Sequence, residues 1–497
     1  MGILLALCLI FISCLIIWRA CDGFEFASEY IGRNMSEGVR GGTINAISSS
    51  LPELFTTMIA LFLISGQAGT GNEEAFSVGI GTTAGSALFN GMIIPAVCIL
   101  SVVGTVILGV KVTSVNVSTK VLLRDGLFLI GAELVLILLL NGTKLYWWHG
   151  LLLMVMYIVY FAYMLLSMKA AGASDDEEDD DEEEDDDDVA RGPIAVVFYW
   201  MSFGPLLDLE SFFVNDETEE KIKNETWNGW PLLLASATVI GVACWLLVMG
   251  CEWLGSGPEH PYELFGMTLP TGLNMPIMFV AVIFASMATS VPDTVISFRD
   301  ARDGDYDDAV ANALGSNIFD ICFALGFPLF LYTLVFQKPI EMGETVAAQS
   351  AELRFILLIL TVLGFLTYYI GKRVKNDDGV TTVAMGRGKA VILLALYALF
   401  VVYIVGLSQK ATWATGLSET VRVQILGHDA NTNASAPTPP GDQANGNDDT
   451  DQTAPSTKPA EENQPTEQTQ PAESADPPDS SDTNDQPGPD ENSSPAK

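Results

Sequence analysis

Apolar residues in this chain are gathered into long uninterrupted runs, not spaced along one face of amphipathic elements. Each run is about as long as the ~20-residue helix that crosses the ~30 Å hydrocarbon core of a bilayer. The pattern predicts an all-α integral membrane protein with about ten transmembrane helices, at 2–18, 40–65, 76–109, 121–140, 147–168, 231–251, 275–298, 308–335, 353–370 and 389–407.

Three stretches depart from a simple span. The first run has no basic n-region and no small-residue cleavage site after it, so we expect a retained helix and not a signal peptide. The run 76–109 is long enough to be bent or doubled. The segment 193–214 is broken by two prolines and a glycine, and we expect it along the membrane surface.

Composition supports a membrane protein and argues against several other classes. Of the 497 residues, 49% are hydrophobic and 17% are charged. Much of the net charge of −37 lies in the acidic run 175–188 and in the tail beyond about 428. The chain has no basic patch, which argues against nucleic-acid binding. Seven cysteines without a CxxC pair, and only three histidines, argue against a zinc site or a disulfide framework.

The distribution of Lys and Arg predicts the orientation of the spans. With an outside N-terminus, the inward loops hold seventeen of these residues, and the outward loops and the stretch after the last helix hold five. Basic residues favour the cytoplasmic side, so we expect both termini outside. The predicted parts are a first five-helix repeat at 1–168, an acidic cytoplasmic loop at 169–230, a second five-helix repeat at 231–410 and an acidic disordered tail at 411–497.

Two short motifs occur once in each half. The Pro-acid motif reads SSLPE at 49–53 and TSVPD at 289–293, and the Gly-Ser motif reads GSALFN at 85–90 and GSNIFD at 315–320. The two Pro-acid copies lie five crossings apart, and an odd number of crossings places the second copy in the opposite orientation. The halves are therefore predicted to form an inverted repeat with broken helices at the shared site.

The residue types in these motifs favour a hard cation. Proline lacks a backbone N–H, so carbonyl groups one turn earlier lose their hydrogen-bond donor. At membrane depth such carbonyl groups are tolerated only where other protein groups or a polar cavity satisfy them. Carbonyl, hydroxyl, amide and carboxylate oxygens are the ligands of Ca²⁺. The candidate ligands are Glu53, Asp293, Ser49, Thr289, Ser50, Ser290, Asn90, Asp320, Ser86 and Ser316.

A purely structural interpretation is available for each motif alone. A single intramembrane acid is often a helix-end side chain that reaches water, and a proline kink is often structural. Three intramembrane acids, each costing ~2.5–3.5 kcal/mol on insertion scales, are harder to explain that way when they recur in symmetric positions. We therefore favour an ion site.

The pairing of the two motifs, repeated in opposite orientation over ten helices, resembles the sodium/calcium exchanger family of cation/calcium antiporters. The resemblance covers about 1–410 and includes CDGFEFASEYIGR at 21–33. It implies that Glu53 and Asp293 are the central calcium ligands, helped by backbone oxygens of Ser49 and Thr289. It also implies sodium sites shaped by Ser50, Ser86, Ser290 and Ser316, with Asn90 and Asp320 on either side of the centre.

The sequence departs from the family pattern in places that bear on the coupling ion. The usual Gly before Thr-Ser is Ser48 in the first copy and Ala288 in the second, the Thr is Ser49, and an expected Asn is Thr82. Asp320 with Asn90 matches prokaryotic members and the potassium-dependent branch. The proton-coupled branch usually has Gly-Asn-x-x-Glu where this chain has Ser-Leu-Pro-Glu, so proton coupling ranks second.

The expected activity is therefore alternating-access exchange of Ca²⁺ for Na⁺ in a plasma or cell membrane, without a cofactor. Ca²⁺/H⁺ exchange and potassium-dependent exchange stay open, and a Ca²⁺-selective channel is the closest rival outside the antiporters. The chain has no P-loop for a pump and no GxGD-type spacing for an intramembrane protease, so we expect no enzyme activity. Inorganic cations and the bilayer are the expected partners. Stoichiometry, protein partners, oligomeric state and the role of the run 175–188 stay open.

Overall fold

A computed structural model describes residues 1–31, 33, 46–64, 72–107, 109–171, 204, 208–224, 226–375 and 380–426. All of them belong to one compact unit, Met1–Ala436. The acidic run 175–188, most of the segment 193–214 and the tail beyond 426 lie outside the described residues.

The first half of the unit holds five membrane-length helical stretches. They are α1 (Gly2–Ile31); α3 (Ala46–Ser49) with α4 (Leu51–Ile59) and the π-helical η2 (Ala60–Ile64); α5 (Asn72–Leu88) with η3 (Phe89–Ile93) and α6 (Ile94–Val102); α7 (Thr119–Leu139); and α8 (Trp147–Ala171). The predicted run 76–109, which was long enough to be bent or doubled, is one helix, Glu73–Val102, with a π-helical turn inside it.

The second half repeats this order. It consists of α13 (Trp230–Gly255); α14 (Ile277–Val280), η5 (Ala281–Ala285), α15 (Ser286–Thr289) and α16 (Val291–Asp303); α17 (Tyr306–Phe319), η6 (Asp320–Ala324) and α18 (Gly326–Phe336); α19 (Glu344–Tyr369); and α20 (Arg387–Ser408). The short helices α11 (Leu209–Phe213) and α12 (Asp216–Lys223) precede α13, and α21 (Thr412–Glu419) with η7 (Thr420–Ile425) follows α20.

The predicted class, a helical membrane protein, is confirmed. Among the described residues, eight helices are long and apolar enough to cross a membrane, and the bent pair Ile277–Thr289 and Val291–Asp303 brings the number to nine. The one predicted span that is not among these nine, 121–140, is helix α7. It carries Lys120, Arg124, Asp125 and Glu133 and is too charged to count by the same measure.

Some predicted boundaries were wrong. Helix α1 runs to Ile31, not to 18, and α19 begins at Glu344, not at 353. Arg354, which we expected in an outward loop, is buried inside α19, where its Nη2 donates to Leu140 O at 2.7 Å. An apolar run marks only the part of a helix that is continuously hydrophobic. It leaves out helical turns whose polar side chains are buried and find hydrogen-bond partners inside the protein.

Two small sheets mark opposite ends of the bundle. Strand β3 (Val115–Ser118) pairs antiparallel with β9 (Thr381–Met385), which also pairs with β8 (Arg373–Lys375); the register sets Val115 against Met385. At the other end, β4 (Lys144–Leu145) pairs with β7 (Ile340–Glu341). Two further hairpins, β1 (Val106–Ile107) with β2 (Val110–Lys111) and β5 (Glu263–Leu264) with β6 (Met267–Thr268), join helices locally.

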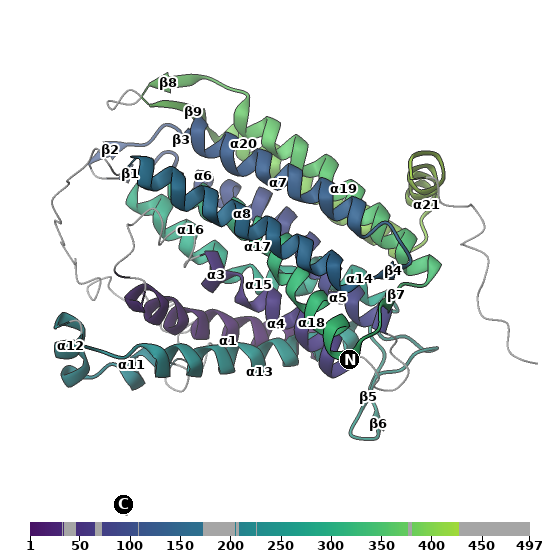
Figure 1. The fold of residues 1–497 in the computed structure, drawn as a ribbon. Helices are drawn as coiled ribbons and strands as arrows, with labels where there is room; N and C mark the ends of the chain where they lie inside the picture. The colour runs from purple at the N-terminus through teal and green to yellow at the C-terminus, as the bar shows by residue number, and fades with distance from the viewer. Residues whose placement is uncertain are drawn as a thin grey trace, which may run out of the picture. The chain divides into compact units, whose positions relative to one another are not determined.

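The sheets show the inverted relation of the two halves. Helix α7 runs from the end that carries β3 to the end that carries β4, and α19 runs from the β7 strand at that second end back to β8 (Figure 1). The fourth helices of the halves therefore point in opposite directions, as the motifs predicted. The first helices, α1 and α13, lie side by side along one face of the bundle and contact α4 and α15 (Figure 1).

A buried acid bonded to a tyrosine recurs in both halves. Asp125 on α7 accepts a hydrogen bond from Tyr160 on α8 at 3.1 Å and pairs with Arg124 Nε at 2.6 Å. Glu352 on α19 accepts one from Tyr403 on α20 and pairs with Arg422 Nε at 2.6 Å. Each acid lies in the first half of its helix, so the two clusters are set toward opposite ends of the bundle.

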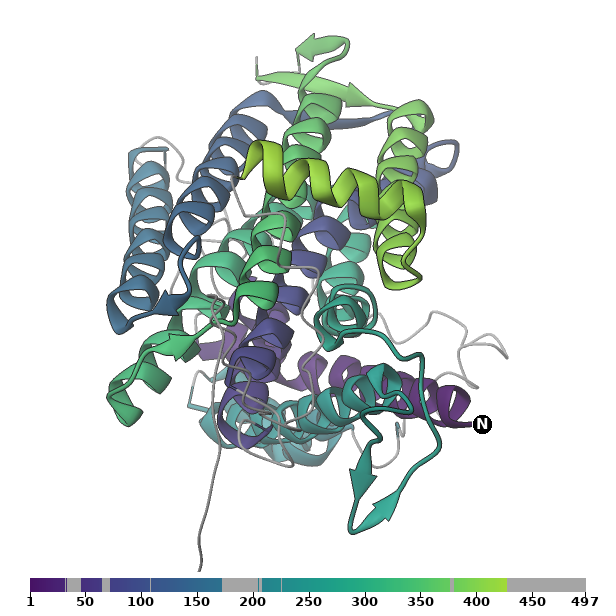
Figure 2. The ribbon, with the colours of Figure 1, turned by 90° about the vertical axis from the view of Figure 1, so that its right-hand side faces the viewer.

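Arg422 reaches its partner because the chain folds back after α20. We placed the start of the tail at 411, but α21 and η7 are helical and contact α20 and α19 (Figure 2, yellow-green). Ser418 Oγ also donates to Glu352 Oε2 at 2.7 Å. A buried carboxylate therefore anchors the segment that follows the last span.

Candidate ion-binding site

Both Pro-acid motifs sit at a break between two short helices. Helix α3 stops at Ser49 and α4 starts at Leu51, with Ser50 between them at φ −94°, ψ 7°. Helix α15 stops at Thr289 and α16 starts at Val291, with Ser290 between them at φ −84°, ψ 6°, and the axis bends there by 44°. Proline in the first turn of the second helix cannot donate to the preceding turn, which explains why the helix restarts at this point.

The two breaks place their acids in the buried centre. Glu53 and Asp293 each lie in the first turn after the break, and both are 0% exposed. Helix N-termini carry a partial positive charge, which is the end of a helix that tolerates a carboxylate best.

Ser86 on α5 is the polar hub of the site. Its Oγ lies 3.1 Å from Glu53 Oε1, 2.8 Å from Asp320 Oδ2 and 2.9 Å from Ser290 Oγ. A hydroxyl has one proton to donate, so it satisfies only one of these oxygens at a time. Ser290 can donate to Ser86, so one approach to a carboxylate oxygen is left over, and it requires a cation or a protonated acid between the two oxygens.

Asp293 is held by side chains from both halves. Ser316 Oγ donates to its Oδ1 at 2.6 Å, and Asn90 Nδ2 donates to its Oδ2 at 3.1 Å. Ser316 Oγ also lies 3.4 Å from Ser49 Oγ. The Gly-Ser motif of each half therefore contacts the Pro-acid motif of the other half, and the site exists only where the two repeats meet.

Close packing of the helices makes this arrangement possible. A Cβ added to Gly85 would lie 2.1 Å from Val282 O and 2.7 Å from Ser286 Cβ. The glycine of GSALFN is thus needed for α5 to approach η5 and α15, and this approach brings Ser86 to Ser290. Gly315 of GSNIFD has more space, because its nearest neighbour would be Tyr160 Oη at 3.7 Å.

Several buried oxygens of the site have no hydrogen-bond partner within the described part of the chain. They are Ser50 Oγ, Glu53 Oε2, Asn90 Oδ1 and Asp320 Oδ1. Across that same part of the chain, none of Glu53, Asp293 and Asp320 forms a salt bridge. Burying carboxylates without a counter-charge is costly, so this oxygen set fits a cation.

The ligand types of the cluster are those of a hard cation. Among the described residues, Glu53, Asp293 and Asp320 do not by themselves form a group of three acids that could hold a metal ion. Serine hydroxyls and an asparagine amide stand between the three acids, and such oxygen ligands are typical of Ca²⁺ and of alkali ions.

Eight of the ten predicted residues form one hydrogen-bonded cluster, and these are Glu53, Ser86, Ser290, Asp320, Asn90, Asp293, Ser316 and Ser49. Ser50 and Ser290 are the break residues themselves, and both are buried. Thr289 is buried too, but its hydroxyl donates to Ser286 O at 3.2 Å within its own helix. Its side chain thus bonds within its own helix and also lies within hydrogen-bond reach of Glu53, and its expected contribution to an ion is a backbone oxygen.

Three residues outside the ten also contact the site. Asn312 Nδ2 donates to Ser297 Oγ at 3.1 Å and lies 3.5 Å from Asp293 O. Asn317 Nδ2 donates to Ala87 O at 2.9 Å and so joins α17 to α5. Cys244 Sγ on α13 lies 3.5 Å from Pro52 O. Asn317 lies inside GSNIFD and could have been found from the motif, whereas nothing in the sequence singles out Cys244.

Comparison with known proteins places these features in context. The family model described as sodium/calcium exchanger protein matches residues 5–166 and 229–406. The sodium/potassium/calcium exchanger Nckx30C of Drosophila melanogaster is 32% identical over 135 residues, which are 27% of this chain and 14% of the relative. Human sodium/potassium/calcium exchanger 4 is 34% identical over 137 residues, 26% of this chain and 19% of the relative. The chain thus matches less than a fifth of the length of these two relatives.

Solved structures with a similar course of the chain have low identity. The sodium-calcium exchanger NCX_Mj is 19% identical, with a TM-score of 0.42 over 80% of this chain and 98% of that chain. The H⁺/Ca²⁺ exchanger CAX is 13% identical, with a TM-score of 0.49 over 84% of this chain and 92% of that chain.

Proposed function

Because the chain belongs to the sodium/calcium exchanger protein family, which its match over both halves establishes, we propose that it exchanges Ca²⁺ for Na⁺ across a membrane. The observation that carries this proposal is the meeting of Glu53 and Asp293, from two inverted helix breaks, in one buried cluster that leaves oxygens without partners. Ca²⁺ and Na⁺ both take oxygen ligands, so they can compete for such a cluster.

We assign the central ligands to Glu53 and Asp293. The surrounding oxygens belong to the Gly-Ser motifs and the breaks: Ser86, Ser316, Asn90, Asp320, Ser49, Ser50, Ser290 and the Thr289 backbone. In this assignment the hydrogen bonds of Ser86 differ between the empty and the ion-bound site, because its hydroxyl lies between Glu53 and Asp320.

Exchange follows from charge. A cluster with two or three ionised acids and no basic partner is costly to close off from water while it is empty. One Ca²⁺ or several Na⁺ ions would remove that cost, so closure would require an occupied site. If three Na⁺ replace one Ca²⁺, one net charge crosses per cycle, which is worth ~2.3 kcal/mol per 100 mV.

The pair α1 and α13 is suited to be the part that moves. These helices lie together and touch the break through Cys244 Sγ and Pro52 O, while α5 and α17 carry the Gly-Ser ligands in the interior. Arg299 Nη2 on α16 lies 3.8 Å from Asp22 Oδ1 on α1, at the surface of this contact. We propose that α1 and α13 slide against the core to expose the site to each side in turn.

The orientation is part of the proposal. The end of the bundle that carries β3, β8 and β9 would face the cytoplasm, because its loops hold Lys111, Lys120, Lys372, Arg373 and Lys375. The loop 169–230 would lie on that side, with both termini outside.

Potassium-dependent exchange is the second candidate, and the observation in its favour is that the curated relatives are sodium/potassium/calcium exchangers. Ca²⁺/H⁺ exchange ranks behind it. Radioactive Ca²⁺ uptake into proteoliposomes loaded with Na⁺, with and without external K⁺, tests the proposal. Uptake that requires internal Na⁺ supports it, and the K⁺ arm decides the branch. Uptake driven only by a proton gradient would overturn sodium coupling, and uptake without any counter-ion would indicate a channel.

A further inference from the structure

Three buried acids of the described residues lie apart from the candidate ion site, and two of them, Asp125 and Glu352, are paired with arginines, whereas the third, Glu133, is not. Glu133, near the middle of the second half of α7, is 1% exposed. Its Oε1 accepts a hydrogen bond from Thr361 Oγ1 on α19 at 2.6 Å. Its Oε2 is buried and has no hydrogen-bond partner in the described ranges. An ionisable side chain at such a depth is costly and indicates function unless a partner neutralises it.

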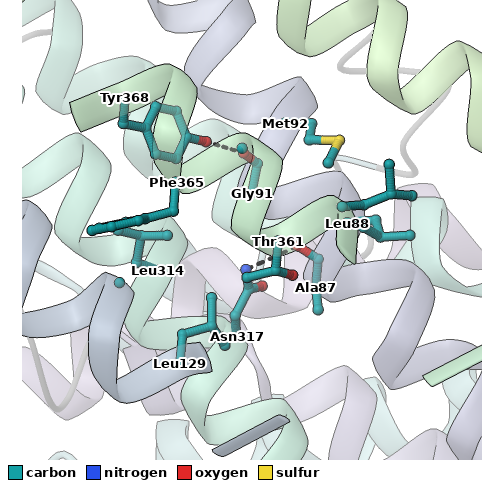
Figure 3. Close-up of a pocket in the computed structure, with 13 residues that line it drawn as sticks. Ala87, Leu88, Gly91, Met92, Leu129, Leu314, Asn317, Thr361, Phe365 and Tyr368 are labelled. Carbon is teal, nitrogen blue, oxygen red and sulfur yellow. Dashed lines mark hydrogen bonds between the residues drawn. The ribbon is translucent and has the colours of Figure 1, made fainter. Parts of the chain in front are cut away.

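Thr361 connects this acid to a small cavity. The cavity holds ≈ 20 Å³, room for about one water molecule, and Thr361, Asn317, Gly91, Leu129 and Tyr368 are among its lining residues (Figure 3). Asn317 donates to Ala87 O, and its buried Oδ1 has no partner among the residues that the structure describes. The cavity is thus partly polar and lies on the backs of α5 and α17, whose other faces carry Ser86 and Ser316.

Within the described residues, no salt bridge joins Glu133 to a cation on the elements that pack against α7. On α19, Arg354 donates to Leu140 O, seven residues further along α7, and Glu344 and Glu352 lie nearer the start of that helix. On α17, Asp307 bonds Ser118 N at the opposite end of α7, next to Asp308. On α8, Tyr160 bonds Asp125, two turns before Glu133, next to Tyr157. On η6, Asp320 is engaged with Ser86.

We propose that Glu133 is a proton-binding site behind the transport site, with Thr361 as its hydrogen-bond donor and the cavity as its water-sized outlet toward Asn317. A proton neutralises a lone carboxylate without further ligands. A metal ion would need about six oxygens, and here the side chains offer one carboxylate, one hydroxyl and one amide oxygen.

Protonation of Glu133 would act on transport through packing. The neutral acid can remain in the contact between α7 and α19, whereas the ionised form would be an unpaired buried charge that draws water in or separates the helices. Since α7 and α19 also contact the ligand-bearing helices α17 and α5, loss of the proton would disturb the site from behind. Transport is then expected to decline as pH rises through the titration of Glu133.

Infrared difference spectroscopy of the purified full-length protein in lipid tests this proposal without depending on transport. Wild type minus Glu133→Gln should show the loss of one protonated-carboxyl band, which fades as pH is raised. Thr361→Val should retain the band and shift it to higher frequency, because the carboxyl loses a donor. Glu344 is an exposed acid at the start of α19, so Glu344→Gln is the matched control and should remove no such band.

The outcomes are distinct from those that test calcium exchange. No lost band in Glu133→Gln, together with no shift in Thr361→Val, would overturn the proton site even if the protein exchanges Ca²⁺. A band that disappears when Na⁺ is added at constant pH would also overturn it, in favour of a monovalent-cation site. In proteoliposomes, Glu133→Gln should flatten the alkaline limb of the pH profile of Ca²⁺ uptake. If that variant does not fold, the frequency shift in Thr361→Val still decides the question.

Discussion

Asn90 Nδ2 lies 3.1 Å from Asp293 Oδ2, so an amide from the first repeat donates to the central acid of the second. The same asparagine leaves its buried Oδ1 without a partner among the described residues. One side chain therefore both fixes an acid and presents an oxygen. This dual role shows why the site needs the two repeats together, and it leads to the predictions below.

Removing the charge of either central acid should strongly weaken calcium binding. Glu53→Gln and Asp293→Asn keep the shape of the side chain and remove its charge, so the affinity for Ca²⁺ should fall about 100-fold or more, equivalent to ~3 kcal/mol. Calorimetric titration of the detergent-solubilised protein with CaCl₂ measures this. The exposed Glu341→Gln is the control and should bind as wild type does. Wild-type affinity in both central variants would refute the assignment of the ligands.

Gly85 of the first Gly-Ser motif and Gly131 on α7 should differ in their tolerance of alanine. Gly85→Ala would place a Cβ 2.1 Å from a backbone oxygen, so we expect a loss of several kcal/mol of stability or a displaced α5 with reduced uptake. Gly131→Ala, on a helix where nothing lies within 4 Å of the added Cβ, should be neutral or stabilising by ~0.5–1 kcal/mol. Thermal unfolding in detergent compares the two. Equal melting temperatures would show that α5 and η5 do not pack as closely as described.

The anchor of α21 and η7 should contribute to stability and the residues beyond it should not. Arg422→Ala leaves Glu352 buried without its cation, and breaking such a pair costs ~3–5 kcal/mol. Lys410→Ala, an exposed residue nearby, is the matched control.

Truncation after 426 completes this comparison, because the tail 427–497 lies beyond the anchor. We expect the truncated protein to melt at the wild-type temperature and to transport Ca²⁺ at the wild-type rate. A large loss of stability on truncation, with none in Arg422→Ala, would show that the anchoring contacts are elsewhere.

Glu210 on α11 should make stability depend on pH. Burial, and then the negative charges of Asp208 and Asp22, raise the pKa of Glu210 above its ordinary value. An acid with a raised pKa in the folded state is penalised when it is ionised, so its cost is present at neutral pH and disappears as pH falls below its unfolded pKa.

Glu210→Gln should therefore raise the melting temperature at neutral pH and leave it unchanged at acidic pH. Glu220→Gln on the exposed face of α12 is the control, with no effect expected at either pH. Stabilisation by Glu210→Gln that is equally large at acidic pH would show that the effect is not one of charge.

The sequence by itself determined the class of this protein and selected the candidate residues of its site. Runs of apolar residues fix membrane spans because the hydrocarbon core admits only helices with satisfied backbone groups. The two Pro-acid motifs, an odd number of crossings apart, were enough to predict the inverted repeat and to select Glu53 and Asp293, and the Gly-Ser motif of the first half selected Ser86 and Asn90. These inferences succeed because the cost of a proline or a carboxylate in a membrane is local and large.

Only the tertiary structure decided which of these residues touch. The contacts of Ser86 with Glu53, Ser290 and Asp320 join α5 to three other helical segments, and their geometry depends on how closely α5 packs at Gly85. The buried partners of Arg354 and Arg422, and the isolation of Glu133, were likewise invisible, because a charged residue in a sequence looks the same whether water or a distant helix satisfies it. The hydrophobic pattern predicts which segments enter the membrane. The partner of a buried polar group is decided by contacts between residues that can lie hundreds of positions apart in the sequence.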